Sequence, residues 1–98
     1  MILTTTNSIE GFKIIEYKGI VTGVAVNMQQ MKMTFNIKKY YSAIGDSVFE
    51  VKEQAFQQLR DNAKNLNANA IVGISVDIEL TTSNYVTVSV TGTAVYVA

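Results

Sequence analysis

Five side chains of this 98-residue sequence could hold a metal ion: three methionines and two acids. Met28, Met31 and Met33 bring three thioether sulfurs into one short stretch, and Cu(I) accepts thioether ligands. Asp77 and Glu79 are two positions apart, so a strand would place both carboxylates on one face, where they could bind a hard cation. Each set has an ordinary alternative, because methionine fills gaps in cores and interfaces and acids commonly form a solvated surface.

Catalysis has few groups to use, because the sequence contains neither cysteine nor histidine. Disulfides, thiolate zinc sites, cysteine nucleophiles and histidine bases are therefore excluded. General acid–base chemistry would depend on Glu16, Asp77, Glu79, a lysine or a tyrosine, and Glu16 and Tyr17 would point to opposite faces of a strand. We predict that the protein is not an enzyme, with no catalytic residue and no cofactor other than a metal ion.

The charges indicate neither nucleic acid nor membrane as a partner, because eight basic residues balance eight acidic ones. Lys38–Lys39–Tyr40–Tyr41 combines cations with stacking rings, but one such cluster on a neutral chain favours an aromatic anchor. Residues 1–45 carry five lysines against two acids, whereas residues 46–98 carry three basic residues against six acids. A subunit with one basic and one acidic flank could stack head to tail in a ring.

Size and hydropathy bound the architecture. A chain of 10.8 kDa should fold with a surface of about 5,500 Å², which supports a single domain over residues 1–98. The apolar runs are far too short to span a bilayer, and the N-terminus lacks the basic and apolar regions of a secretory signal. We therefore expect a cytoplasmic protein.

The first predicted element is a strand over residues 13–26, rich in β-branched side chains. Its two faces are both apolar, which predicts that both are covered. Gly19 and Gly23 interrupt it, and glycine inside a strand indicates a bulge or a close approach of another backbone. Residues 28–44 are ambiguous: Met28, Met31 and Phe35 fit helical spacing, but the alternation of Met31, Met33 and Phe35 with polar residues favours an extended conformation.

A helix is predicted over residues 47–67, where apolar residues recur every three or four positions. Gly45–Asp46–Ser47 is interpreted as a break before it, and Ser47 with Glu50 matches a capping box. Asn67 is a plausible residue for the left-handed position that ends a helix. Two strands, 70–80 and 85–97, alternate apolar and polar residues across a turn at 81–84, which predicts an antiparallel hairpin.

The predicted fold is therefore α+β, with the order β–α–β–β. The helix would connect the first two strands so that they pair in parallel, and it would cover one face of a three-stranded sheet. One helix cannot cover both apolar faces of the first strand, and the two sheet edges invite further pairing. We therefore predict a homo-oligomer formed through the sheet.

Three stretches carry a resemblance to a known family: TTT…IEG…IIEY.GIVTG.A from Thr4 to Ala25, ANAIVGI from Ala68 to Ile74, and VSVTGTAV from Val88 to Val95. In combination they resemble the YbjQ-like family, small bacterial proteins with a heavy-metal-binding label. The resemblance implies a β–α–β–β subunit in a ring, typically a pentamer, and no established reaction.

The middle of the chain departs from the family pattern. The stretch from Met28 to Asp46 is shorter than usual, and Gly45 stands alone where the family has a Gly-Gly-Arg turn. Ser75–Val76–Asp77 stands where the family often has Asp-x-Asp. A ligand site built from that arginine or that acid pair does not carry over to this chain.

Taken together, we predict a non-enzymatic, ring-forming scaffold or small-ligand binding protein whose partner is itself. The alternative is a metal-binding protein that holds Cu(I) through Met28, Met31 and Met33, or hard cations through Asp77 and Glu79.

Overall fold

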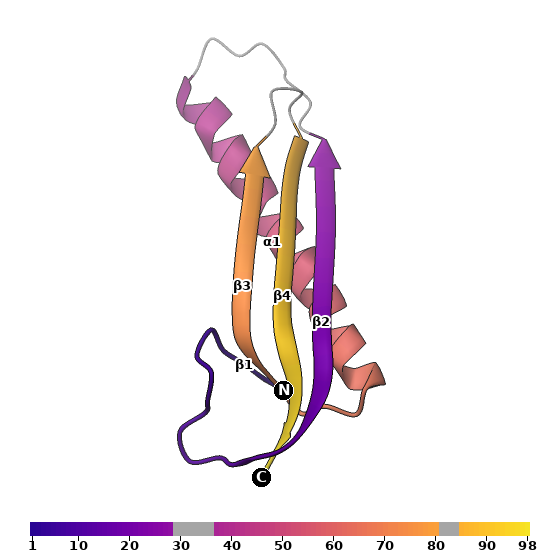
Figure 1. Ribbon diagram of the computed structural model, residues 1–98. Coiled ribbons are helices and arrows are strands. Elements are labelled where there is room, and N and C mark those ends of the chain that lie inside the picture. Colours follow the sequence, from indigo (N-terminus) through magenta and orange to yellow (C-terminus); the bar gives the residue numbers. More distant parts are fainter. Residues whose placement is uncertain (29–36, 81–84) are drawn as a thin grey trace.

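The computed structural model describes residues 1–28, 37–80 and 85–98, and gives only the backbone of residues 27–28 and 37–47. Within these ranges the chain forms one helix and four strands (Figure 1). Their bounds are β1 Ile2–Leu3, β2 Ile14–Met28, α1 Ile37–Asn65, β3 Ala70–Leu80 and β4 Tyr85–Val97. The α+β class and the three long strands are as predicted.

The sheet has four strands in the order β1–β3–β4–β2. The prediction of three strands was wrong, because it did not include β1, which has two residues. β4 lies between β2 and β3 and is antiparallel to both. The predicted hairpin of β3 and β4 is confirmed. The predicted parallel pairing of the first two long strands was wrong, because β4 is inserted between them. β1 adds a short parallel pair at the outer side of β3.

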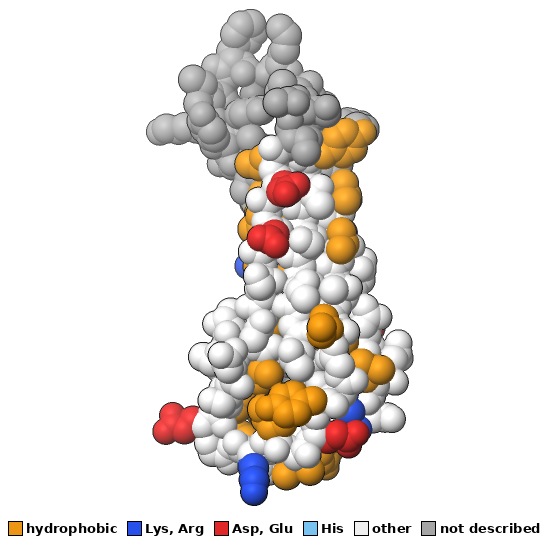
Figure 2. All heavy atoms as spheres, viewed as in Figure 1, with side chains coloured by type: hydrophobic (Ala, Val, Ile, Leu, Met, Phe, Trp, Pro, Cys, Tyr) orange, Lys and Arg blue, Asp and Glu red, His pale blue; other side chains and the backbone are white. Residues whose placement is uncertain are grey.

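The molecule is long and thin, with extents of 55 × 23 × 17 Å (Figures 1 and 2). Its accessible surface is 6672 Å², about a fifth more than the size of the chain predicts for a compact monomer. The excess arises because α1 crosses the sheet diagonally on one face and the opposite face has no second layer of helices (Figure 1). A single copy of this chain therefore exposes more surface than a typical domain of its mass.

The helix is longer than predicted, because it begins at Ile37 rather than near residue 47. The break at Gly45–Ser47 and the capping box of Ser47 with Glu50 were therefore wrong, as was the extended conformation for residues 37–44. A glycine inside a helix costs only about 1 kcal/mol, which a long helix tolerates. The predicted C-terminal signal is confirmed, because Asn67 has φ 61° and the Ala68 N–H donates to the Ala63 carbonyl at 3.1 Å.

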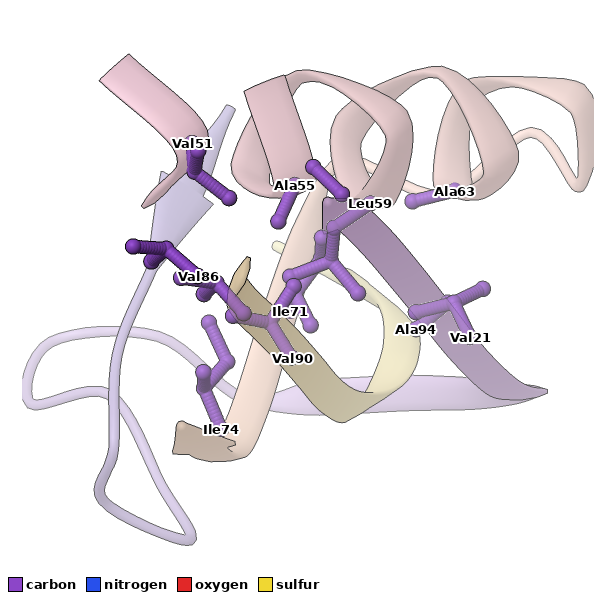
Figure 3. Packing of buried hydrophobic residues seen from close by; sticks show 12 residues of the cluster. Val21, Val51, Ala55, Leu59, Ala63, Ile71, Ile74, Val86, Val90 and Ala94 are labelled. Atoms are coloured by element: carbon purple, nitrogen blue, oxygen red, sulfur yellow. The ribbon is translucent and has the colours of Figure 1, made fainter. Parts of the chain in front are cut away.

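The main core lies between α1 and the sheet (Figure 3). Four helix residues face the strands at the spacing of one helical stripe, and all four are fully buried: Val51, Ala55, Leu59 and Ala63. They pack on alternate residues of β4 and on β2, which include Val86, Val88, Val90 and Val21. A second, smaller cluster forms around Ala70, Val72, Val95 and Val97, against which Ile9 and Ile14 pack.

Both glycines of β2 have the roles that strand glycines indicate. Gly19 has φ 134° and lies at a shift in the register between β2 and β4. Gly23 lies against the helix backbone, where an added Cβ would overlap the carbonyl oxygen of Ala55. The first glycine bends the strand, and the second lets α1 approach the sheet closely.

Candidate functional site

The carboxylates of Asp77 and Glu79 lie where the sequence places them, on one face of β3. Both side chains are exposed, and neither has an ion pair or a hydrogen bond to a described residue. Asp77 is paired with Ser89 of β4 and Glu79 with Thr87. The arrangement therefore offers two free carboxylates beside two hydroxyl groups.

This pair alone does not make a metal site. Calcium and similar hard cations take six or more oxygen ligands. In the part of the chain that the structure describes, no three Asp, Glu, His or Cys side chains come together. A hard cation would need further ligands from water or from another copy of the chain.

The methionines fall at or beyond the end of β2. Met28 is the last residue of that strand, paired with Tyr85, and its backbone alone is described. Met31 and Met33 lie outside the described residues. The structure therefore does not test whether the three thioethers lie together, and the Cu(I) site stays a prediction.

Among the residues whose side chains are described, those considered for acid–base chemistry do not gather into a site. Glu16 accepts an ion-pair hydrogen bond from Lys18 Nζ at 3.0 Å, and Tyr17 beside it is exposed. This ion pair joins two residues on the same face of one strand, with Glu16 exposed and Lys18 half-buried. Residues 38–41 lie in the first turns of α1, where the backbone alone is described.

The open face of the sheet changes from acidic to apolar across its three long strands. In one cross-strand row Asp77 of β3 is next to Ser89 of β4, which is next to Val24 of β2. The following row repeats the order with Glu79, Thr87 and Val26. Figure 2 shows this face, with acidic and apolar side chains on different parts of it.

The apolar side of this face was predicted to be covered, and in the single chain it is not. Ile20, Val24 and Val26 form a row along β2, here called the β2 stripe, and Ile20 is 78% exposed. α1 packs on the other face of the same strand, over Val21 and Ala25. The strand is thus apolar on both faces, as its composition indicated, but one chain supplies a cover for only one of them.

Two backbone groups on the outer edge of β2 are occupied by side chains from the helix. Gln58 Oε1 accepts a hydrogen bond from the Val24 N–H at 3.1 Å, and Asn62 Nδ2 donates to the Thr22 carbonyl at 2.8 Å. These two bonds occupy backbone groups that an added strand would need, which is one way proteins protect an edge strand. In the sequence, the only signal for this contact is that Gln58 and Asn62 directly precede Leu59 and Ala63 of the buried helix stripe.

The second half of β3 exposes apolar side chains on the face that α1 covers elsewhere in the sheet. Val76, Ile78 and Leu80 share a face with the buried β4 valines, yet they are exposed, Leu80 to 62%. The helix packs mainly on β2 and β4 and leaves this row uncovered. The residues of β3 beyond Ile74 thus expose apolar side chains on one face and acids on the other.

Among the described residues, no helix is long and apolar enough to cross a membrane. α1 is amphipathic along its described length, with its apolar stripe against the sheet. The buried stripe of Val51, Ala55, Leu59 and Ala63 is therefore used in the core, whereas Phe49 on the same helix is exposed.

Comparisons with known proteins agree with the resemblance in the sequence. The YbjQ family, described as "Putative heavy-metal-binding", matches residues 1–98. The chain is 33% identical to a UPF0145 protein of Acetivibrio thermocellus, with 99% of each chain covered. It is 37% identical to a UPF0145 protein of Bacillus cereus, over 97% of this chain and 98% of the relative.

A solved structure has the same fold. It is the crystal structure of a protein of unknown function from Pediococcus pentosaceus, assigned to the DUF74 family. Its TM-score is 0.75 at 22% sequence identity, and the match covers 100% of this chain and 98% of that one. At this identity the likeness concerns the fold alone.

Proposed function

Because the chain belongs to the YbjQ family, as do the UPF0145 proteins, we propose that it is the subunit of a non-enzymatic homo-oligomeric ring. The ring acts in the cytoplasm as a scaffold or as a binding protein for a small ligand. Resemblance to the family suggests five subunits. The scarcity of catalytic side chains in the sequence supports a role without chemistry.

The β2 stripe is the observation that carries this proposal. Ile20, Val24 and Val26 lie on one face of β2, with the exposed Thr22 between the first two, and all three are exposed. Burying a side chain of this kind contributes about 1.5–3 kcal/mol. An exposed apolar surface of this kind commonly marks a protein–protein interface. The accessible surface of the single chain is also larger than that of a compact monomer of its mass, which likewise favours burial of this face in an oligomer.

A heterologous contact between neighbours is what closes a ring. The apolar edge of the open face and its acidic edge lie on opposite sides of the sheet, on β2 and β3. A subunit with two different flanks suits a head-to-tail arrangement better than a two-fold one. The β2 stripe would pack against a different surface of the next subunit.

The variant Val24→Lys tests the role of the β2 stripe. A lysine there places a charge inside the proposed interface, while the Val24 backbone keeps its bond to Gln58. Light scattering after size-exclusion chromatography should report a smaller species with unchanged circular dichroism. Gln54→Lys, on the exposed side of α1, is the matched control and should keep the wild-type mass. An unchanged mass for Val24→Lys contradicts the proposed interface.

Metal binding is the second candidate, favoured by the two unpartnered carboxylates of Asp77 and Glu79. A ring would repeat this pair once per subunit, which could supply the further oxygen ligands that a hard cation requires. Metal analysis of the protein and of the variant Asp77→Asn with Glu79→Gln tests this candidate. Loss of a bound cation in the variant would support it, and equal metal content in both proteins would contradict it.

A further inference from the structure

Among the described residues, the outer edge of β3 is paired only along its first half. There the N-terminal segment runs beside it: the Thr4 N–H donates to the Ile71 carbonyl at 3.0 Å, and the Ile74 N–H donates to the Thr4 carbonyl at 3.1 Å. The Gly73 N–H donates to the Thr6 carbonyl at 2.8 Å, and Ile74 is the last residue of β3 bonded to this segment. From residue 75 to residue 80, no described residue pairs with the edge.

The backbone groups on this open part follow from the bond at Ile74. Its N–H points away from β4, because it donates to Thr4. Residues of a strand direct their backbone groups alternately to either side, so those of Val76, Ile78 and Leu80 point outward as well. They offer an extended segment the donors and acceptors that the N-terminal segment uses at Ile71 and Ile74.

The two faces of this open edge specify what could pair with it. On the helix side the exposed side chains of β3 are Val76, Ile78 and Leu80. On the other side are Asp77 and Glu79, which have no partner among the described residues. An added strand would direct its own side chains alternately to these two faces. Apolar residues would suit the first face, and basic residues the second.

We propose that the β3 edge from Ser75 to Leu80 binds an extended segment of another protein in which basic and apolar residues alternate. Such β-strand addition derives affinity from backbone bonds and specificity from alternate side chains. A second copy is a poorer occupant, because antiparallel pairing of two β3 edges would bring acids beside acids. On the β2 edge of a second copy, Gln58 and Asn62 occupy the Val24 N–H and the Thr22 carbonyl, which pairing would need.

This inference does not depend on the proposed ring. The β2 stripe and the β3 edge lie on opposite sides of β4, so each can be altered separately. Peptide binding can fail while the ring persists, and the reverse holds equally.

A fluorescein-labelled nonapeptide of alternating lysine and valine is the probe, and fluorescence anisotropy is the measurement. We expect saturable binding that weakens with added salt. Three control peptides should bind at least tenfold more weakly: alternating glutamate and valine, the same lysines and valines arranged in two blocks, and the alternating peptide with alternate backbone amides methylated. Equal binding of the block or the methylated peptide would overturn the proposal, because charge alone would then explain it.

Variants locate the site. Asp77→Asn with Glu79→Gln should weaken binding of the lysine–valine peptide about tenfold, from the loss of two cross-strand charge pairs. Glu50→Gln with Glu53→Gln removes the same charge from an exposed part of α1 and should leave the affinity unchanged. Equal affinities of the two variants would overturn the proposal. So would a gain in oligomer mass for Asp77→Asn with Glu79→Gln, which would assign the edge to a second copy.

Discussion

Gly23 of β2 lies directly against the carbonyl oxygen of Ala55 in α1, so strand and helix meet backbone to backbone. The variant Gly23→Ala would push a methyl group into that oxygen and toward the Leu59 amide. Neither backbone can move without disturbing the fully buried Ala55 and Leu59 side chains. We expect a loss of about 3 kcal/mol in the free energy of unfolding, measured by urea denaturation.

Thr22→Ala is the control, because the Thr22 side chain is exposed and its carbonyl bond to Asn62 does not involve the side chain. Its unfolding midpoint should change little. A Gly23→Ala protein with the wild-type midpoint would show that α1 does not approach β2 as described.

The helix side chains that close the β2 edge should protect the protein from aggregation. Replacing Gln58 and Asn62 by alanine frees the Val24 N–H and the Thr22 carbonyl. We expect a loss of about 1–2 kcal/mol in unfolding free energy and faster light-scattering growth on incubation, because the edge can then pair between molecules. Gln57→Ala, which removes only a bond to Asp61 within the helix, should not aggregate faster. Equal scattering of both variants would refute this role.

Asn69 joins the start of β3 to the end of β4. Its side chain donates to the Val97 carbonyl at 2.8 Å and accepts from the Val97 N–H at 2.7 Å. Asn69→Ala removes both bonds at a partly buried position, so we expect a loss of about 2 kcal/mol in thermal or urea denaturation. Asn67→Gly should change stability by only a few tenths of a kcal/mol, because glycine suits the left-handed backbone there. Equal stability of the two variants would contradict the bridging role of Asn69.

The sequence was most informative where periodicity and local chemistry agree. Val51, Ala55 and Leu59 recur at helical spacing, and all three are buried. The strand bounds of 70–80 and 85–97 match β3 and β4, and the left-handed Asn67 is confirmed. The glycines also have the roles expected of them, because a glycine in a strand has few other reasons to be present.

Most of the errors have a shared cause, because they depend on contacts between distant residues. Strand order is set by which faces fit together, so the insertion of β4 between β2 and β3 left no trace in any one segment. The break at Gly45 failed because a long helix outweighs one weak residue. β1 has only two residues and exists because it pairs with Ala70 and Ile71. The bonds of Gln58 and Asn62 to β2 likewise span 34 and 40 residues.

Removal of metal ions distinguishes the proposed scaffold from a metal-binding protein. If the proposed scaffold needs no ion, treatment with EDTA should leave both the assembly mass and the unfolding midpoint unchanged. The triple variant with leucine at Met28, Met31 and Met33 should take up as much Cu(I) as the wild type, because the proposal gives those sulfurs no ligand role. A fold that is retained while Cu(I) uptake is lost would favour the metal alternative, with the thioethers as ligands.

The most direct test of the account is the native mass spectrum of the tag-free protein at micromolar concentration. The exposed β2 stripe and the family resemblance predict a mass near five subunits of 10.8 kDa each. The Val24→Lys variant in the same experiment should shift toward the single subunit. A wild-type spectrum that contains only the bare monomer would contradict the proposed ring, and the apolar row on β2 would then need another cover.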